Sequence, residues 1–107
     1  MSGSRSLFLE ARTPLGFTVR VTRDYWNIII TVKHPAMAGC QAEVEAALET
    51  PEEIRRSRSD ANVYLFYRRR RNRRWVCAVS KQEGRTGFLI TAYPTDAIKE
   101  GERIWPK

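Results

Sequence analysis

The sequence predicts an α+β domain in which two N-terminal helices pack on one face of a four-stranded antiparallel sheet, preceded by a short N-terminal β element. Two observations support this class. Helix boundary signals and helical periodicity occur between residues 23 and 50, whereas apolar and polar residues alternate in most segments from residue 53 onward. Short turns join the alternating segments, and consecutive strands with short connections pair antiparallel.

The length of the chain sets the number of domains. A chain of 107 residues can build one layered core and is too short for a second one. We therefore expect a single domain over residues 1–107, with residues 1–5 disordered.

The first elements are expected before residue 35. Residues 6–11 and 17–21 alternate around Pro14 and Gly16, so they form two short strands or one strand with a turn. A helix should follow over residues 23–34, with Thr22 as its cap and Pro35 at its end. Its β-branched run would also suit a strand. We favour the helix because four side chains would share one face: Trp26, Ile29, Ile30 and Lys33.

A second helix is expected between Gly39 and Pro51. Its apolar face would carry Val44, Ala47 and Leu48, while glutamates face water. Four strands should follow over residues 54–58, 61–69, 74–82 and 86–94. After them the chain is expected to leave the sheet in one helical turn and to pack Trp105.

Positive charge is concentrated in one part of the chain. The net charge is +7, but residues 55–74 alone carry nine arginines and one acid, a net charge of +8. The remaining residues, with ten bases and eleven acids, carry −1. Such a block on a folded domain indicates a polyanionic partner, and arginine grips phosphates in a bidentate manner. The alternative is a charged hairpin that only keeps the sheet soluble.

Several classes of protein are not indicated. No apolar run approaches the ~18 residues of a membrane span, and the N-terminus does not read as a signal peptide, so we expect a cytoplasmic protein without membrane contact. Cys40 and Cys77 belong to no CxxC motif and are expected as buried free thiols. With a single histidine, a zinc site is not expected, and we predict no metal and no cofactor.

One histidine and a set of hydroxyl and cationic side chains form the candidate catalytic group. His34 is the residue type that exchanges protons near neutrality, although a helix C-terminal histidine can also be purely structural. Thr91 and Tyr93 alternate on the last strand and therefore share a face. Cleavage of RNA by its own 2′-hydroxyl needs a base, an acid and cations around phosphorus, and no cofactor. If His34 and Tyr93 flank one phosphate, their rings should lie within about 10 Å of each other.

Several segments resemble those of a family of small bacterial and phage proteins grouped with the barnase, EndoU, colicin and RelE type nucleases, the BECR fold. The resemblance spans residues 22–105 and rests on four motifs: His34-Pro35, Pro51-x-x-Ile54, the Tyr67-Arg68 strand end and Thr91-Ala92-Tyr93. It implies a RelE-like fold and metal-independent ribonuclease activity, commonly in a toxin or effector. The positions that it carries over are His34, Arg55 or Arg56, Tyr67 or Arg68, Lys81, Thr91 and Tyr93.

Together these observations predict a toxin-type, metal-independent endoribonuclease. The catalytic residues would be His34, Arg55, Arg68, Lys81, Thr91 and Tyr93. The residues that bind RNA would be Arg56, Tyr67, Arg69, Arg70, Arg71, Arg73 and Arg74. Two other readings remain open: a non-catalytic nucleic-acid-binding module, and an interaction domain whose arginines meet an acidic partner such as an antitoxin or immunity protein.

Overall fold

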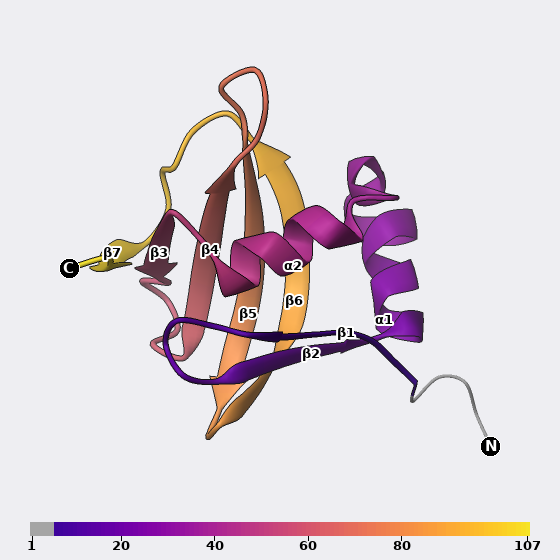
Figure 1. The fold of residues 1–107 in the computed structure, drawn as a ribbon, viewed down its shortest axis with the longest axis horizontal. Helices are drawn as coiled ribbons and strands as arrows, with labels where there is room; N and C mark the ends of the chain where they lie inside the picture. Colours follow the sequence, from indigo (N-terminus) through magenta and orange to yellow (C-terminus); the bar gives the residue numbers. More distant parts are fainter. Residues whose placement is uncertain (1–5) are drawn as a thin grey trace.

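The computed structural model describes residues 6–107, which form two helices packed on a seven-stranded mixed sheet (Figure 1). The expected disorder of residues 1–5 lies outside the described residues. The elements are β1 (Leu7–Arg12), β2 (Thr18–Thr22), α1 (Arg23–Ile28), the π-helical turn η2 (Ile29–Lys33), the 3-10 turn η3 (Pro35–Met37), α2 (Gln41–Glu49), β3 (Glu53–Arg56), β4 (Val63–Arg69), β5 (Trp75–Glu83), β6 (Thr86–Thr95) and β7 (Glu102–Trp105).

The α+β class is confirmed, but the sheet has seven strands and one parallel pair, where four antiparallel strands were expected. Strands β3 to β6 form the expected antiparallel meander within the order β1-β2-β6-β5-β4-β3-β7. The N-terminal hairpin is not a separate element, because β2 pairs parallel with the first residues of β6. The C-terminal segment does not form the expected helical turn, because Glu102–Trp105 pairs with β3 as an edge strand.

Both predicted helices are present. The Thr22 hydroxyl accepts a hydrogen bond from the Tyr25 backbone N–H at 3.2 Å, which caps α1 as expected. The β-branched run that also suited a strand continues α1 as the π-helical turn Ile29–Lys33. In α2 the expected apolar face is confirmed, because Val44, Ala47 and Leu48 are fully buried.

The sheet is buried on both faces around β4 and β5. The main core lies on the side of α2, where the β1–β2 hairpin also crosses in front of the meander (Figure 1). A smaller cluster on the opposite face contains Leu65, Tyr67 and Cys77, and Ile98 from the segment after β6 packs against it. Alternate residues of β4 and β5 therefore enter different cores, which explains their nearly continuous apolar sequence.

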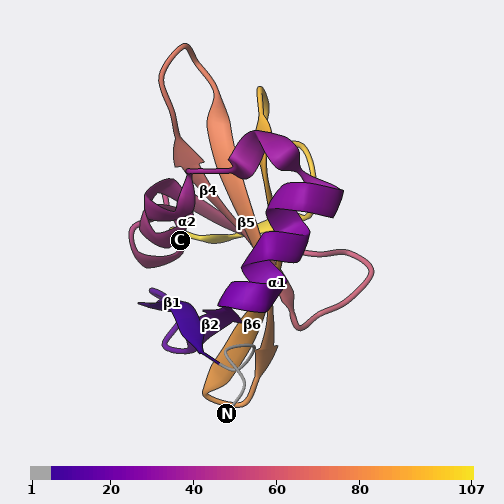
Figure 2. The same ribbon diagram turned by 90° about the vertical axis from the view of Figure 1, so that its right-hand side faces the viewer.

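Helix α1 covers the part of β6 that β2 leaves unpaired. The pairing of β2 stops at Phe88, so beyond this residue one edge of β6 has no strand partner. The Tyr25 hydroxyl donates to the Ile90 carbonyl oxygen at 2.7 Å, and the Lys33 ammonium donates to the same oxygen at 3.0 Å. Seen from that side, the helix lies along the edge of the sheet (Figure 2).

Gly87 of β6 allows the backbone of β5 and the Phe17 ring to approach closely. A Cβ atom at this position would lie 2.5 Å from the Lys81 carbonyl oxygen and 3.1 Å from the Phe17 ring. We expect Gly87→Ala to lower the free energy of unfolding by about 1–3 kcal/mol, the usual cost of an overpacked core. Urea denaturation measures this loss. Thr86→Ser, at the exposed neighbouring position, is the control and should change stability little, and equal stabilities would contradict the close approach.

Candidate functional site

His34 and Tyr93, which are 59 positions apart in the sequence, lie side by side. His34 follows η2, and the centroids of its ring and the Tyr93 ring are 5.4 Å apart. This separation lies within the expected span of about 10 Å. The backbone N–H of His34 donates to the Ile29 carbonyl oxygen at 2.7 Å, which closes the π-helical turn and places the histidine next to β6.

Lys33 and Thr91 lie along the same edge. The Lys33 ammonium bonds the Ile90 carbonyl oxygen and the Tyr25 hydroxyl, at 3.0 and 2.7 Å, so two of its three N–H donors are used within the fold. Thr91 follows Ile90, and its buried hydroxyl has no hydrogen-bond partner among residues 6–107. The edge of β6 therefore presents an imidazole, an ammonium and two hydroxyl groups within one short stretch.

Tyr93 forms a row with Tyr67 and Cys77 across three strands. Cys77 pairs with Tyr67 on one side and with Tyr93 on the other, so the three side chains point to the same face. Burial, and then the neighbouring Cys77 thiol, raise the pKa of Tyr93 well above the ordinary phenol value. Burial likewise raises the pKa of the Cys77 thiol to about 12. Tyr93 is consequently protonated near neutral pH.

The cations that we expected around the catalytic pair are placed elsewhere. Arg68 donates to the Thr50 carbonyl oxygen at 2.6 Å and neutralises the end of α2. Arg55 contacts Glu53 at 2.6 Å and the Gly101 carbonyl oxygen at 3.2 Å, on β3. Lys81 contacts Asp60 at 3.2 Å. The structure thus brings together His34, Thr91 and Tyr93, and does not bring Arg55, Arg68 or Lys81 to them.

Two of the expected RNA-binding residues, Tyr67 and Arg56, lie outside the exposed part of the hairpin. Tyr67 is 1% exposed in the second cluster, so the expectation that it contacts RNA is wrong for this structure. The reason is its position on β4, where both faces are covered. Arg56 stacks on Tyr64 at 5.6 Å and lies on β3, away from the hairpin.

The arginine-rich β4–β5 hairpin projects beyond the rest of the molecule (Figure 2). Two of its arginines hold it in place. Arg70 binds Glu43 of α2 in a bidentate manner, at 2.5 and 3.3 Å, and Arg69 stacks on the Trp75 ring at 5.0 Å. Three exposed arginines at its tip make no side-chain contact with an acid among residues 6–107: Arg71, Arg73 and Arg74.

The turn at the tip has an unusual composition. Asn72 and Arg73 adopt left-handed conformations, with φ values of 59° and 61°, and the Arg74 N–H donates to the Arg71 carbonyl oxygen at 3.3 Å. Glycine is preferred at such positions because a Cβ atom makes them about 1–2 kcal/mol less favourable. Arg73 adopts this conformation nevertheless.

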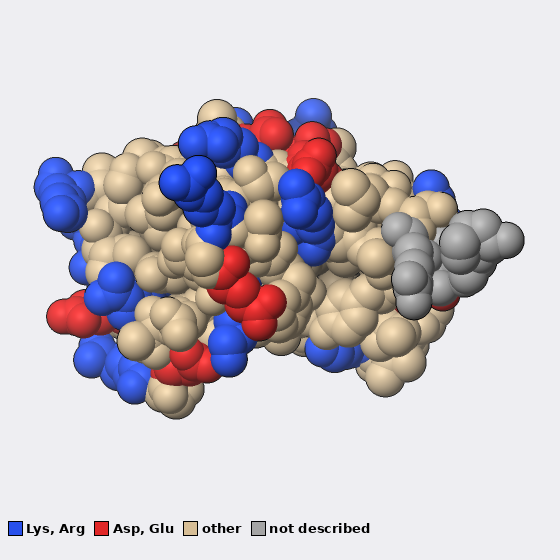
Figure 3. All heavy atoms as spheres, turned by 90° about the horizontal axis from the view of Figure 1, so that it is seen from below, with Lys and Arg blue, Asp and Glu red and all other residues tan. Residues whose placement is uncertain are grey.

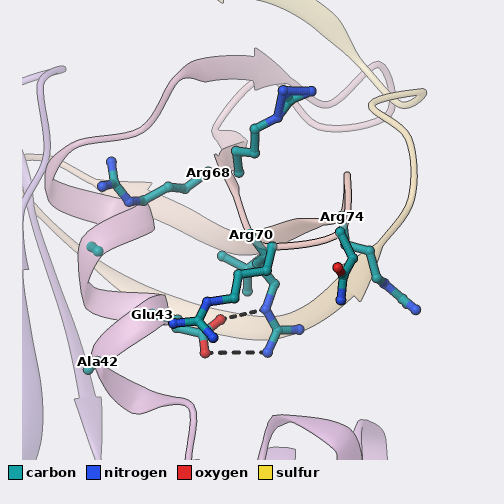
Figure 4. A pocket seen from close by; sticks show the side chains of 10 residues that line it. Ala42, Glu43, Arg68, Arg70 and Arg74 are labelled. Atoms are coloured by element: carbon teal, nitrogen blue, oxygen red, sulfur yellow. Dashed lines mark hydrogen bonds and ion pairs between the residues drawn. The ribbon is translucent and has the colours of Figure 1, made fainter.

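A cleft of about 830 Å³ separates the hairpin from α2. Figure 4 shows Arg70 pointing at Glu43 across it, and Arg68 turned along α2. Its lining residues are Ala42, Glu43, Ala46, Arg68, Arg69, Arg70, Arg71, Asn72, Arg74 and Val76. By contrast, the surface seen from below mixes basic and acidic side chains (Figure 3).

No group of three or more His, Cys, Asp or Glu side chains within residues 6–107 is placed to share a metal ion. No helix in this part of the chain is both long and apolar enough to cross a bilayer. Cys40 and Cys77 are both free, and only Cys77 is buried.

Comparison of the chain with family models, with curated proteins and with solved structures found no match. The similarity to BECR nucleases therefore remains an expectation from sequence motifs.

Sequence reasoning missed two residues of this region, Lys33 and Trp75. Lys33 directly precedes His34, and its position next to the only histidine was the available signal. Trp75 directly follows the arginine run, and an aromatic ring within a basic stretch is typical of surfaces on which bases stack.

The burial of Cys77 predicts a pH dependence of stability. Its pKa is raised from 9.0 to about 12, so the folded chain holds this proton in a range where the unfolded chain has lost it. The contribution of the protonated Cys77 thiol to the free energy of unfolding is complete below pH 9 and is lost as the pH rises toward 12. We expect Cys77→Ala to make the alkaline fall of unfolding free energy shallower by up to about 1.4 kcal/mol per pH unit.

Denaturant titrations between pH 8 and 11 measure this slope. Val79→Ala is the control, because Val79 lies on the same strand and face but carries no proton. It should lower stability at every pH without changing the slope. Parallel curves for wild type and Cys77→Ala would rule out a raised thiol pKa.

Proposed function

We propose that this protein is a metal-independent endoribonuclease with His34 and Tyr93 at its centre. The observation that supports it is the 5.4 Å separation of the two rings. These residues come from opposite halves of the chain, and the π-helical turn and the end of β6 position them together. A general base and a proton donor that flank one phosphate require this arrangement.

The chemistry assigns one role to each group. Neutral His34 takes the proton of the 2′-hydroxyl, whose oxygen then attacks phosphorus and expels the 5′-oxygen. Tyr93 gives its proton to that leaving alkoxide and recovers one from the protonated His34. The products are a 2′,3′-cyclic phosphate and a 5′-hydroxyl. Tyr93 stays protonated near neutral pH and so has a proton to give, although burial raises its pKa and makes it a weaker acid.

Charge stabilisation falls to Lys33 in this proposal. Its ammonium has one N–H donor left, and it precedes His34 in the chain. Thr91 adds a buried hydroxyl without a partner in the described part of the chain. Cations and fixed hydroxyl dipoles near phosphorus stabilise the additional negative charge of the transition state.

Substitution of the proton-transfer pair tests the proposal. We expect His34→Ala and Tyr93→Phe each to slow RNA cleavage by ~10²-fold or more, the usual scale for a positioned acid or base. The double variant should lose little beyond the slower single one, since residues that act in one step are not additive. The assay follows 2′,3′-cyclic phosphate ends from mixed RNA in EDTA.

Lys81→Gln serves as the control, because Lys81 pairs with Asp60 and lies outside the proposed centre. Its cleavage rate should equal that of the wild type. Full activity of His34→Ala would falsify the assignment. RNA binding without any cleavage by the wild type would favour the second candidate.

The second candidate is a non-catalytic RNA-binding module. It is favoured by one observation, the three tip arginines that meet no acid within residues 6–107. Arg69 stacked on Trp75 adds an aromatic platform at the base of the same hairpin. An acidic protein partner could use the same charges, but it would gain nothing from the aromatic ring.

Neutralisation of the tip tests this binding surface. We expect Arg71→Gln, Arg73→Gln and Arg74→Gln in one variant to weaken RNA binding and to reduce the log–log salt slope by about 2, at ~0.7 per single-strand phosphate contact. The control removes three exposed arginines elsewhere: Arg12, Arg85 and Arg103. The control variant lowers the net charge by the same amount and should keep the salt slope of the wild type. Equal slopes in both variants would exclude the tip from the interface.

A further inference from the structure

We propose that the cleft between α2 and the β4–β5 hairpin is a subsite for one unpaired nucleotide, and that the protein therefore selects single-stranded RNA. This inference rests on the proposed function, because it names the form of RNA that the same site accepts. The inference goes beyond the attraction of phosphates by arginines, since it says that one base of the RNA binds in the cleft.

The shape and lining of the cleft suit a nucleotide. Its volume of about 830 Å³ lies within the usual range of about 300–1,000 Å³ for ligand sites. Ala42 and Ala46 of α2 supply small apolar surfaces, and the buried Val76 of β5 closes the cleft behind them. Small side chains leave room for a flat ring, whereas the arginines of the hairpin provide cations at the rim.

The charges of the cleft are largely uncompensated. Glu43 is the acid that lines it, and Arg70 already binds both oxygens of this carboxylate. Arg68 is bonded to the Thr50 carbonyl oxygen, which carries no net charge. Arg71 and Arg74 have no acid partner among residues 6–107. A phosphate can therefore enter without displacing an existing ion pair.

The position of the cleft agrees with a neighbouring cleavage site. Tyr93 pairs with Cys77, and the neighbouring residue of β5, Val76, lines the cleft from the other face of the sheet. Cys40, six residues after His34, lies 3.6 Å from the Arg70 guanidinium. The proposed centre and the cleft thus lie at the same end of the sheet but on opposite faces, so a strand bound at both passes around the end of the sheet.

The apolar lining favours an unpaired base. In a duplex the bases are stacked and paired, and only phosphates and the shallow minor groove are presented. Arginines alone would bind both forms through their phosphates, whereas contact with Ala42 and Ala46 requires a base that is free to leave its stack.

The test uses 2′-O-methyl RNA, which cannot undergo attack by its own 2′-oxygen, so that binding is measured apart from cleavage. The wild type should bind a single-stranded oligonucleotide at least about 10-fold more tightly than an abasic strand with the same number of phosphates. Loss of one base stack of about 1.4 kcal/mol corresponds to this factor. A duplex of equal charge should bind as weakly as the abasic strand.

Filling the cleft should abolish this preference. Ala46→Phe occupies the space without changing charge, so single-strand affinity should fall to the abasic level at an unchanged salt slope. Ala61→Phe, in an exposed turn outside the cleft, is the control and should behave as the wild type. The comparison of wild-type ligands decides the question even if Ala46→Phe does not fold.

The outcomes separate the two proposals. Equal wild-type affinities for the single, abasic and duplex ligands would overturn the subsite, even if natural RNA is still cleaved to cyclic phosphate ends. A base-dependent affinity that Ala46→Phe removes would support the subsite, even if no cleavage of natural RNA is found.

Discussion

The carbonyl oxygen of Ile90 is the point on which the candidate site depends. Strand β6 has no strand partner there, and α1 and η2 satisfy the edge through the Tyr25 hydroxyl and the Lys33 ammonium. A buried carbonyl without a donor would be costly, so these bonds fix the helix against the sheet. Because His34 follows Lys33 directly, the same contacts set the distance between its ring and Tyr93.

The arginines of residues 55–74 divide into two groups with different physical roles. Arg55, Arg68 and Arg70 bond carboxylates or carbonyls within the fold, and Arg56 and Arg69 stack on aromatic rings. Their charge is used to fasten α2, the hairpin and the edge of the sheet. The surplus is concentrated at the tip, where arginines are exposed. A block of like charges in the sequence therefore contains arginines that stabilise the fold and arginines that are exposed to solvent.

The local part of the fold was predictable from the sequence, and the non-local part was not. Thr22, Pro35 and Pro51 gave the ends of the helices, and alternation gave the meander, because caps and periodicity act over a few residues. The parallel pairing of β2 with β6 joins residues about 68 positions apart, and no local signal reports such a partner. The four residues of β7 are too few for alternation to distinguish them from a loop.

The same limit applies to the candidate site. The alternation of side chains along a strand correctly put Thr91 and Tyr93 on one face. It could not reveal that Arg68 bonds Thr50 at the end of α2, or that a second cluster buries Tyr67. Whether a cation is free depends on Thr50, Glu53 or Asp60 reaching it, and those contacts are set by tertiary structure.

The π-helical turn has a consequence for how the site is encoded. A π turn holds one residue more than an α turn, and each residue of an α-helix turns the chain by about 100°. Loss of one residue between Ile29 and Val32 would restore α geometry and rotate His34 away from Tyr93, although neither ring had changed. The number of residues in this segment is therefore as important to the site as their identity. A related chain that lacks one of them would keep His34 and Tyr93 in its sequence but would not bring the two rings together.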